Sequence, residues 1–250
     1  MGLFDKKFCS VCGQKVGTLF HRKLEDGYLC KDCTAKLSPF FSERRSSTAD
    51  EIREQLAYRE DNRQQLERFH ITRTLGKDMK VHMDEDARKF LVTRARDIRE
   101  ANPDLLDYSQ VTGVDVDVTE SQSEYQRRTA DGKMVSYVPP KYTFSAGIRV
   151  IIHVNSPWFD TITVPIASSI QLNAGNPLPA SMRPVPESNR EFKECLDMAN
   201  EIRRILTTAR EQARTETAAP RKAVICPCCG ATTVPDAAGC CEYCGGATGA

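Results

Sequence analysis

Ten of the eleven cysteines lie in two clusters near the ends of the chain, and eight of them form four Cys-x-x-Cys pairs. Two thiolates at this spacing can hold one ion, and four complete the tetrahedral shell of Zn²⁺. In a reducing compartment the pattern indicates metal ligation rather than disulfide bonds. We therefore predict two zinc ions per chain. The predicted ligands are Cys9, Cys12, Cys30 and Cys33 at the first site and Cys226, Cys229, Cys241 and Cys244 at the second.

The N-terminal cluster has two unlike halves. Gly13 follows the pair that ends at Cys12 and permits a tight turn that aims backbone amides at sulfur, as in a zinc knuckle. The pair that ends at Cys33 precedes Thr-Ala-Lys-Leu and is expected on the first turn of a short helix, where amides favour thiolates. Residues 14–29 predict a hairpin between the halves. The order is typical of a treble-clef finger over residues 1–41. Redox dithiols, the alternative, would require a βαβ context that the sequence lacks.

Each C-terminal pair is followed by a glycine, Gly230 or Gly245. Two facing knuckles of this kind predict a zinc ribbon over residues 224–250, with iron as the alternative metal of an all-thiolate site. Cys228 and Cys240 are then spare, although the register would let either replace a ligand. The segment has so few apolar residues that we expect it to be unfolded without metal.

Between the clusters, apolar residues recur with a period of two. The clearest run is 142–154, in which every even position is apolar and the odd positions are mostly polar. This alternation predicts antiparallel strands with one buried face over residues 74–172, with Asp131-Gly132 as a hairpin turn. An amphipathic helix is expected over 188–213, with Ser188 as its N-cap. Strands followed by one closing helix favour a small β-barrel or bent sheet capped by that helix, so residues 74–213 form one domain.

Two polar segments join these parts. Residues 42–73 contain a charged helix, for which Thr48 and Glu51 have the spacing of a capping box. Its apolar stripe is thin, so we expect it to bridge modules or to pack lightly. Residues 214–223 read as a linker. The fold class is therefore α+β and multi-modular.

Parts of the sequence resemble known families. Residues 1–45, with Arg73–Lys77 and Tyr108–Gly113, are similar to a bacterial family of unknown function that pairs a four-cysteine finger with a β-rich domain. The similarity extends to about residue 172 and implies the architecture, but it implies no activity. The order of strands and helix in the β-domain resembles pleckstrin-homology-like folds, and this is a likeness of topology alone.

Composition limits the other functional classes. A formal net charge of +1 gives no global attraction to nucleic acid or anionic lipid. We find no apolar run long enough to span a bilayer and no apolar core of a secretory signal, and Lys6 stands where a myristoylation motif needs Ser or Thr. These observations predict a cytoplasmic protein.

The chemistry-bearing residues outside the clusters have structural interpretations. His82 and His153 are expected on the solvated faces of strands, Asp84–Asp86 in a turn, and Cys195 on the apolar side of the helix. The sequence contains no zinc-protease, serine-hydrolase or phosphate-loop motif. Four thiolates also leave zinc no open position for water. We therefore expect no catalytic residues.

These points predict a non-enzymatic adaptor or scaffold that binds a protein, or a membrane surface through the β-domain. The first alternative is a nucleic-acid-binding finger protein, and the second is a thiol redox or rubredoxin-like electron-transfer protein. The basic residues that favour the first alternative are Lys15, His21, Arg22, Lys23, Lys31, Lys36, Arg44 and Arg45. The C-terminal ribbon has almost none.

Overall fold

A computed structural model describes residues 7–17, 21–42, 45–218, 224–234 and 239–248. Contacts divide the chain into two compact units, residues 1–210 and 211–250. The first unit contains the finger, two sheets and most of the long helix α4 (Arg190–Ala218). The second contains the C-terminal cysteines. Within the described residues, no helix is both long and apolar enough to cross a membrane.

The N-terminal finger begins with a turn that carries the first cysteine pair. A short hairpin follows, formed by β1 (Arg22–Lys23) and β2 (Tyr28–Leu29). The second pair begins helix α1 (Lys31–Lys36), with Cys30 as its N-cap. The predicted order of turn, hairpin and helix is confirmed.

The β-rich part consists of two open antiparallel sheets. The first is a meander of β3 (Arg73–Gly76), β4 (Lys80–Asp84), β5 (Lys89–Thr93) and β6 (Leu105–Asp107), with the short helix α3 (Ile98–Ala101) before β6. The second joins β7 (Val111–Arg128), β8 (Met134–Val154) and β9 (Thr161–Gln171). Of the two predicted alternatives, a small β-barrel or a bent sheet, the barrel is wrong, because none of the described strands of the first sheet pairs with the second.

One apolar core lies between the sheets and α4. The even positions of 142–154 are all buried or half-buried, so the predicted alternation is confirmed. Val81, Phe90 and Ile152 reach this core from three strands, and Ile202 reaches it from α4. Leu91, which lies between Phe90 and Val92 in β5, points to the face of the first sheet that is turned away from this core and packs there against Leu66. That sheet is therefore covered on both sides.

The long helix α4 presents the predicted apolar face to this core. Phe192, Cys195, Ala199, Ile202 and Leu206 are buried, and the other apolar positions are half-buried. The predicted N-cap is wrong by one residue. Ser188 ends a 3₁₀ turn and its hydroxyl donates to Val185 O, whereas Asn189 Oδ1 accepts the Phe192 N–H at 3.0 Å.

Helix α2 (Ala49–Leu66) is more buried than its composition predicts. Thr48 and Glu51 form the expected capping box. Of the two alternatives expected for this helix, bridging modules or packing lightly, the second is wrong, because α2 buries Ile52, Gln55, Arg59, Asn62 and Leu66 at steps of three and four. This buried stripe is largely polar, which is why hydrophobic periodicity does not detect it.

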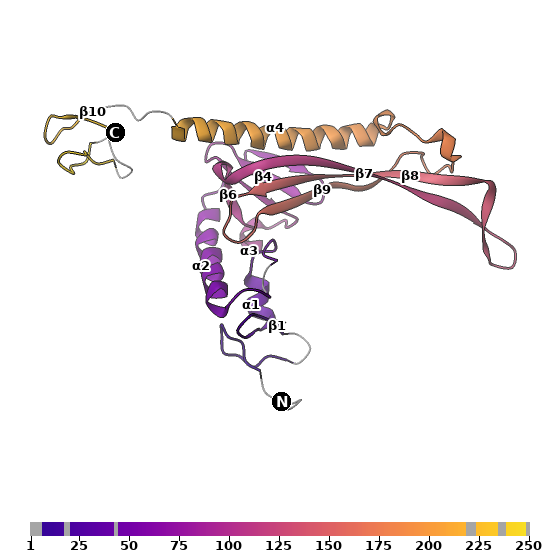
Figure 1. Cartoon of the computed structure of the whole chain (residues 1–250), viewed down its shortest axis with the longest axis horizontal. Coiled ribbons are helices and arrows are strands. Elements are labelled where there is room, and N and C mark those ends of the chain that lie inside the picture. Colours follow the sequence, from indigo (N-terminus) through magenta and orange to yellow (C-terminus); the bar gives the residue numbers. More distant parts are fainter. Residues whose placement is uncertain (1–6, 18–20, 43–44, 219–223, 235–238, 249–250) are drawn as a thin grey trace. The chain divides into compact units, whose positions relative to one another are not determined.

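Beyond the core, β7 and β8 continue as a two-stranded ribbon. Strand β9 pairs with β8 only between Ser145 and His153, whereas β7 and β8 pair as far as Arg128 and Met134. Figure 1 shows this ribbon extending past β9. The turn between the strands contains Asp131-Gly132, as predicted.

The second unit is small. Its strands are β10 (Val224–Ile225) and β11 (Thr232–Thr233), which pair with each other. A bridge from Cys240 to Ala247 closes the second knuckle.

Candidate metal centres

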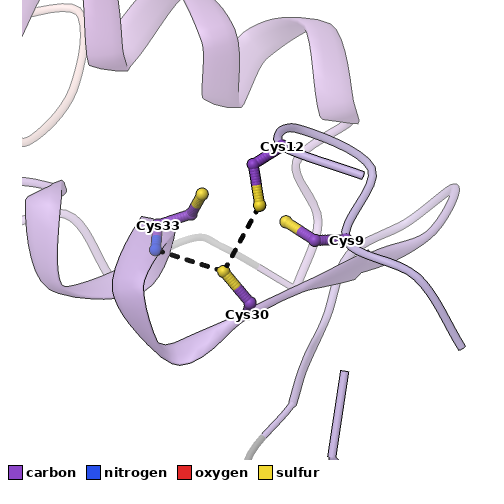
Figure 2. A group of neighbouring side chains, drawn as sticks. All are labelled: Cys9, Cys12, Cys30 and Cys33. Carbon is purple, nitrogen blue, oxygen red and sulfur yellow. Dashed lines mark hydrogen bonds between the residues drawn. The ribbon is translucent and has the colours of Figure 1, made fainter. Parts of the chain in front are cut away.

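The four N-terminal cysteines converge on one point. Figure 2 shows the sulfurs of Cys9, Cys12, Cys30 and Cys33 directed toward one another, two from the turn and two from the start of α1. Their Sγ atoms all lie within 4.8 Å of one another, and Cys12 Sγ lies 3.7 Å from Cys30 Sγ. This grouping was predicted from the sequence. The geometry is compatible with one tetrahedral ion.

Local backbone structure explains the position of the first pair. Gly13 has φ +71°, in the left-handed region that glycine tolerates best. Its N–H donates to Cys9 O at 2.8 Å, and the Cys9 N–H donates to Gln14 O at 2.8 Å. The turn therefore folds back on itself and exposes amides toward sulfur. In α1, the Cys33 N–H donates to Cys30 Sγ at 3.4 Å.

The electrostatics of the N-terminal cluster fit a cation. Burial raises the pKa of Cys9, but N–H groups of Cys12, Cys30 and Val11 outweigh it and lower this pKa to about 6. Burial and the neighbouring sulfurs raise the pKa of Cys33. One thiolate thus forms easily, whereas further ionisation is resisted by negative charge. A divalent cation would remove that resistance.

The C-terminal cysteines form a more symmetrical site from two knuckles. The Sγ atoms of Cys226, Cys229, Cys241 and Cys244 lie within 4.8 Å of one another. In the first knuckle the Gly230 N–H donates to Cys226 O at 2.8 Å, and in the second the Gly245 N–H donates to Cys241 O at 2.8 Å. The predicted grouping is again present.

The C-terminal cluster has the same division of charge. Burial raises the pKa of Cys241, but the N–H groups of Cys244 and Tyr243 outweigh it and lower this pKa to about 6. The Gly246 N–H favours the Cys244 thiolate, yet contacts with Cys229 and Cys226 raise the pKa of Cys244 to about 12. The donor set therefore also fits a divalent cation.

The spare cysteines lie beside this site. Cys228 is exposed and lies next to Gly246, where an added Cβ would come within 2.8 Å of Cys228 Sγ and 3.4 Å of Cys244 Sγ. Cys240 is half-buried. Neither belongs to the four-sulfur group.

A buried polar joint connects the finger to the sheets, and sequence reasoning missed it. Arg59 Nη1 donates to Asp104 Oδ1 at 2.9 Å, and Ser38 Oγ donates to Asp104 Oδ2 at 2.7 Å. Arg59 Nε also donates to Lys36 O at 3.2 Å, at the end of α1. The Asp104 side chain is fully buried. Burial raises the pKa of Asp104, while Arg59 and Ser38 act against this shift.

The joint is completed by amide and aromatic contacts. Asn62 Nδ2 donates to Pro103 O at 2.7 Å, and Asn62 Oδ1 accepts the Leu105 N–H at 2.8 Å. Phe41 packs edge-on against Trp158, with ring centroids 6.1 Å apart. The only sequence signal was the three- and four-residue spacing of polar positions in α2, which resembles an ordinary solvated helix face.

Other chemistry-bearing residues have structural partners. His82 is buried rather than solvated, because it pairs with Leu91, whose face of the sheet is covered. Thr74 Oγ1 lies 2.9 Å from its Nδ1, and burial lowers the pKa of His82. His153 is half-buried, with 42% of its side chain exposed, and its Nε2 lies 3.0 Å from an Asp115 carboxylate oxygen.

The expected turn and buried cysteine are also present. Asp84 caps its turn by accepting N–H groups of Ala87 and His70 at 2.9 and 2.8 Å. Cys195 is fully buried. These side chains therefore have packing or hydrogen-bonding roles in the fold.

One family model matches the chain. It is described as Domain of unknown function (DUF4428) and matches residues 7–55. The matched segment contains the N-terminal cysteines and the first part of α2. The wider similarity predicted up to about residue 172 lies outside this match. Comparisons with curated proteins and with solved structures gave no match.

Proposed function

We propose that this protein is a zinc-stabilised, non-enzymatic adaptor whose binding surface belongs to the β-rich part. The observation that carries the proposal is the pair of four-sulfur groups, each with its Sγ atoms within 4.8 Å. Four thiolates fill the coordination shell of zinc, so each metal would stabilise its module and leave no position for substrate water. A reducing compartment such as the cytoplasm is part of the proposal, because the ligands must stay as thiols.

Exposed apolar side chains support a binding role for the β-rich part. Six of the eleven large exposed hydrophobic residues among those described lie on strands β7 and β8 or on the loop between β9 and α4. Met182 and Val185 in this loop are each 63% exposed. Such clustering is typical of surfaces that contact a partner. The partner we propose for the loop is a protein.

Metal analysis tests the stabilising role. Under reducing conditions the full chain should contain two zinc ions, measured by mass spectrometry of the metal. Cys12→Ser and Cys229→Ser should each lose one ion, whereas Cys228→Ser, which changes a sulfur outside the group, should retain both. Absence of metal would contradict the proposal. A red iron centre in the second unit would favour rubredoxin-like electron transfer.

The adaptor role has separate tests. A protein captured by the full chain should be lost with Met182→Glu/Val185→Glu and retained with Ile225→Glu, a matched exposed position in the other unit. Equal capture by all three would remove the loop as the binding surface. Turnover by the purified protein that persists after all eight ligand cysteines are changed to serine would place chemistry in the β-rich part.

A further inference from the structure

The distal ribbon, which we define as residues 119–143, has two accessible faces. Apart from a bridge between Tyr142 and Leu178, its strands pair only with each other, and most of its residues are exposed. An isolated two-stranded ribbon buries little apolar surface and is only marginally stable in water. The pairing continues nevertheless to Arg128 and Met134. The side chains of the distal ribbon are therefore available to contact a partner and do not form an apolar core.

The two faces differ in charge. Alternate residues of a strand share a face, so Glu120, Gln122 and Glu124 of β7 lie together on one face. Glu120 accepts a hydrogen bond from Arg183 Nη2 at 2.6 Å, which ties the β9–α4 loop to that side. Tyr125 is paired with Lys141 on the other face of the ribbon. Arg127 lies two residues farther along β7 and therefore on the same face as Tyr125. That face of the distal ribbon carries aromatic rings and cations.

These aromatic and cationic side chains are in contact. The rings of Tyr125 and Tyr137 stack, with centroids 5.9 Å apart and planes 22° from parallel. Lys141 Nζ lies 5.0 Å from the centroid of the Tyr137 ring, and Arg127 Cζ lies 5.9 Å from it. We call Tyr125, Arg127, Tyr137 and Lys141 the tyrosine–cation face. Its members hold one another in place before any ligand arrives.

The cations of this face have no acidic partner in the described part of the chain. Nearer the core, by contrast, Arg149 pairs with Asp117 at 2.6 Å on the same side of the sheet. An unpaired Arg and Lys beside stacked rings are able to neutralise phosphates while the rings support bases.

The edge of β8 argues against a peptide strand as the occupant. Tyr125 pairs with Lys141 but Gln126 pairs with Ser136, so residues 137–140 bulge out of the ladder. Val138 is 97% exposed there, and the two prolines that follow it have no N–H to donate. A partner at this bulge must be bound through side chains. The stacked rings match the planar bases of a flexible nucleic-acid strand, which the headgroups of an anionic membrane do not offer.

We propose that the tyrosine–cation face binds single-stranded nucleic acid, with bases stacked near Tyr125 and Tyr137 and phosphates on Arg127 and Lys141. This goes beyond the proposed function, because it gives the adaptor a second class of partner at a place other than either metal centre. The binding would tolerate many sequences, since every base has a stacking surface.

The test is fluorescence anisotropy of labelled 15-nucleotide DNA and RNA strands with the zinc-loaded full chain, over a range of salt concentrations. Tyr137→Leu should weaken binding about tenfold, the loss expected for one stacked base. Arg127→Ala/Lys141→Ala should weaken it further and should reduce the slope of log K against log salt by about 1.4, or about 0.7 per phosphate contact.

Arg128→Ala is the matched control. Arg128 is exposed and adjacent in sequence, but it is paired with Met134 on the opposite face. The Arg128→Ala variant should lose much less affinity for the labelled strands than the Arg127→Ala variant. Unchanged melting curves should accompany each variant, because all the altered side chains lie outside the core.

Several results would overturn the proposal. They are no binding of either strand at 50–100 mM salt, equal losses for Arg127→Ala and Arg128→Ala, and binding only to anionic vesicles. Loss of binding with Arg22→Ala/Lys23→Ala but not with the ribbon variants would assign the nucleic acid to the finger instead. None of these results would change the zinc content, so failure here is distinguishable from failure of the zinc-stabilised adaptor.

Discussion

The two metal centres share one backbone device but differ in their surroundings. Gly13 and Gly230 have φ angles of +71° and +73°, and each follows a cysteine pair in a knuckle. Around the first centre, Leu24, Leu29 and Ile52 are fully buried. In the second unit the only buried residues besides cysteine, among those described, are Thr233 and Thr248. The two sites therefore share a four-sulfur arrangement, but one lies beside an apolar cluster and the other does not among the described residues.

This difference indicates what metal contributes in each place. The finger has an apolar cluster and a polar joint to the sheets, so zinc would add to an existing core. The described residues of the second unit form no apolar core, so zinc would be the core there. Substitutions and metal removal should therefore affect the two units unequally.

Removing zinc with a chelator should have the largest effect. The second unit should unfold, because apparent binding free energies of structural zinc are about 10–16 kcal/mol and little else holds this segment. The finger should loosen near its cysteines, whereas Leu29 and Ile52 should stay packed. Amide hydrogen exchange measures both units in one sample. Equal loss of amide protection in the finger and in the second unit would contradict the proposed difference in what zinc contributes to each.

Asp104→Ala should separate the finger from the sheets. It leaves buried Arg59 without a carboxylate, and breaking a buried pair in this way costs about 3–5 kcal/mol. Chemical denaturation of the zinc-loaded protein measures the change. Asp50→Ala is the control, because the Asp50–Arg53 pair is exposed and should be worth less than about 1 kcal/mol. Exchange in the second unit should be unaffected by either variant.

Deleting an apolar side chain should distinguish the units directly. Leu24→Ala removes a fully buried side chain from the finger cluster and should cost about 2–5 kcal/mol. Ile225→Ala, at a position that is 72% exposed in the second unit, should cost less than about 0.5 kcal/mol. A large cost at Ile225, measured by denaturation of its own unit, would reveal an apolar core there.

The knuckle glycines should give the smallest effect. Gly13→Ala and Gly230→Ala each place a side chain in the left-handed region, at about 1–2 kcal/mol. Neither new Cβ meets a neighbouring atom within 4 Å, so backbone strain is the whole cost. For Gly230 the loss should appear as roughly tenfold weaker zinc binding in a chelator competition. For Gly13→Ala, part of the strain energy should appear as reduced thermal stability of the finger rather than as weaker zinc binding.

The sequence was sufficient for the features that depend on local spacing. The cysteine pairs, the glycine after each knuckle and the capping box at Thr48 and Glu51 are determined within a few residues. The alternation over 142–154 likewise fixes which side of β8 is buried, since side chains of a strand alternate by geometry. These features could be predicted because neighbouring residues alone decide them.

How the buried surfaces pack together depends on long-range contacts. Two open sheets occur where a β-barrel or a bent sheet was expected, because strand closure depends on pairing between distant segments. The burial of His82 and the Arg59–Asp104 joint also depend on contacts made across the fold, and polar residues give no periodic signal of burial. The sequence was therefore sufficient for both four-cysteine clusters, whereas long-range packing determined that one cluster is built onto the sheets and that the other has no apolar core around it among the residues that the structure describes.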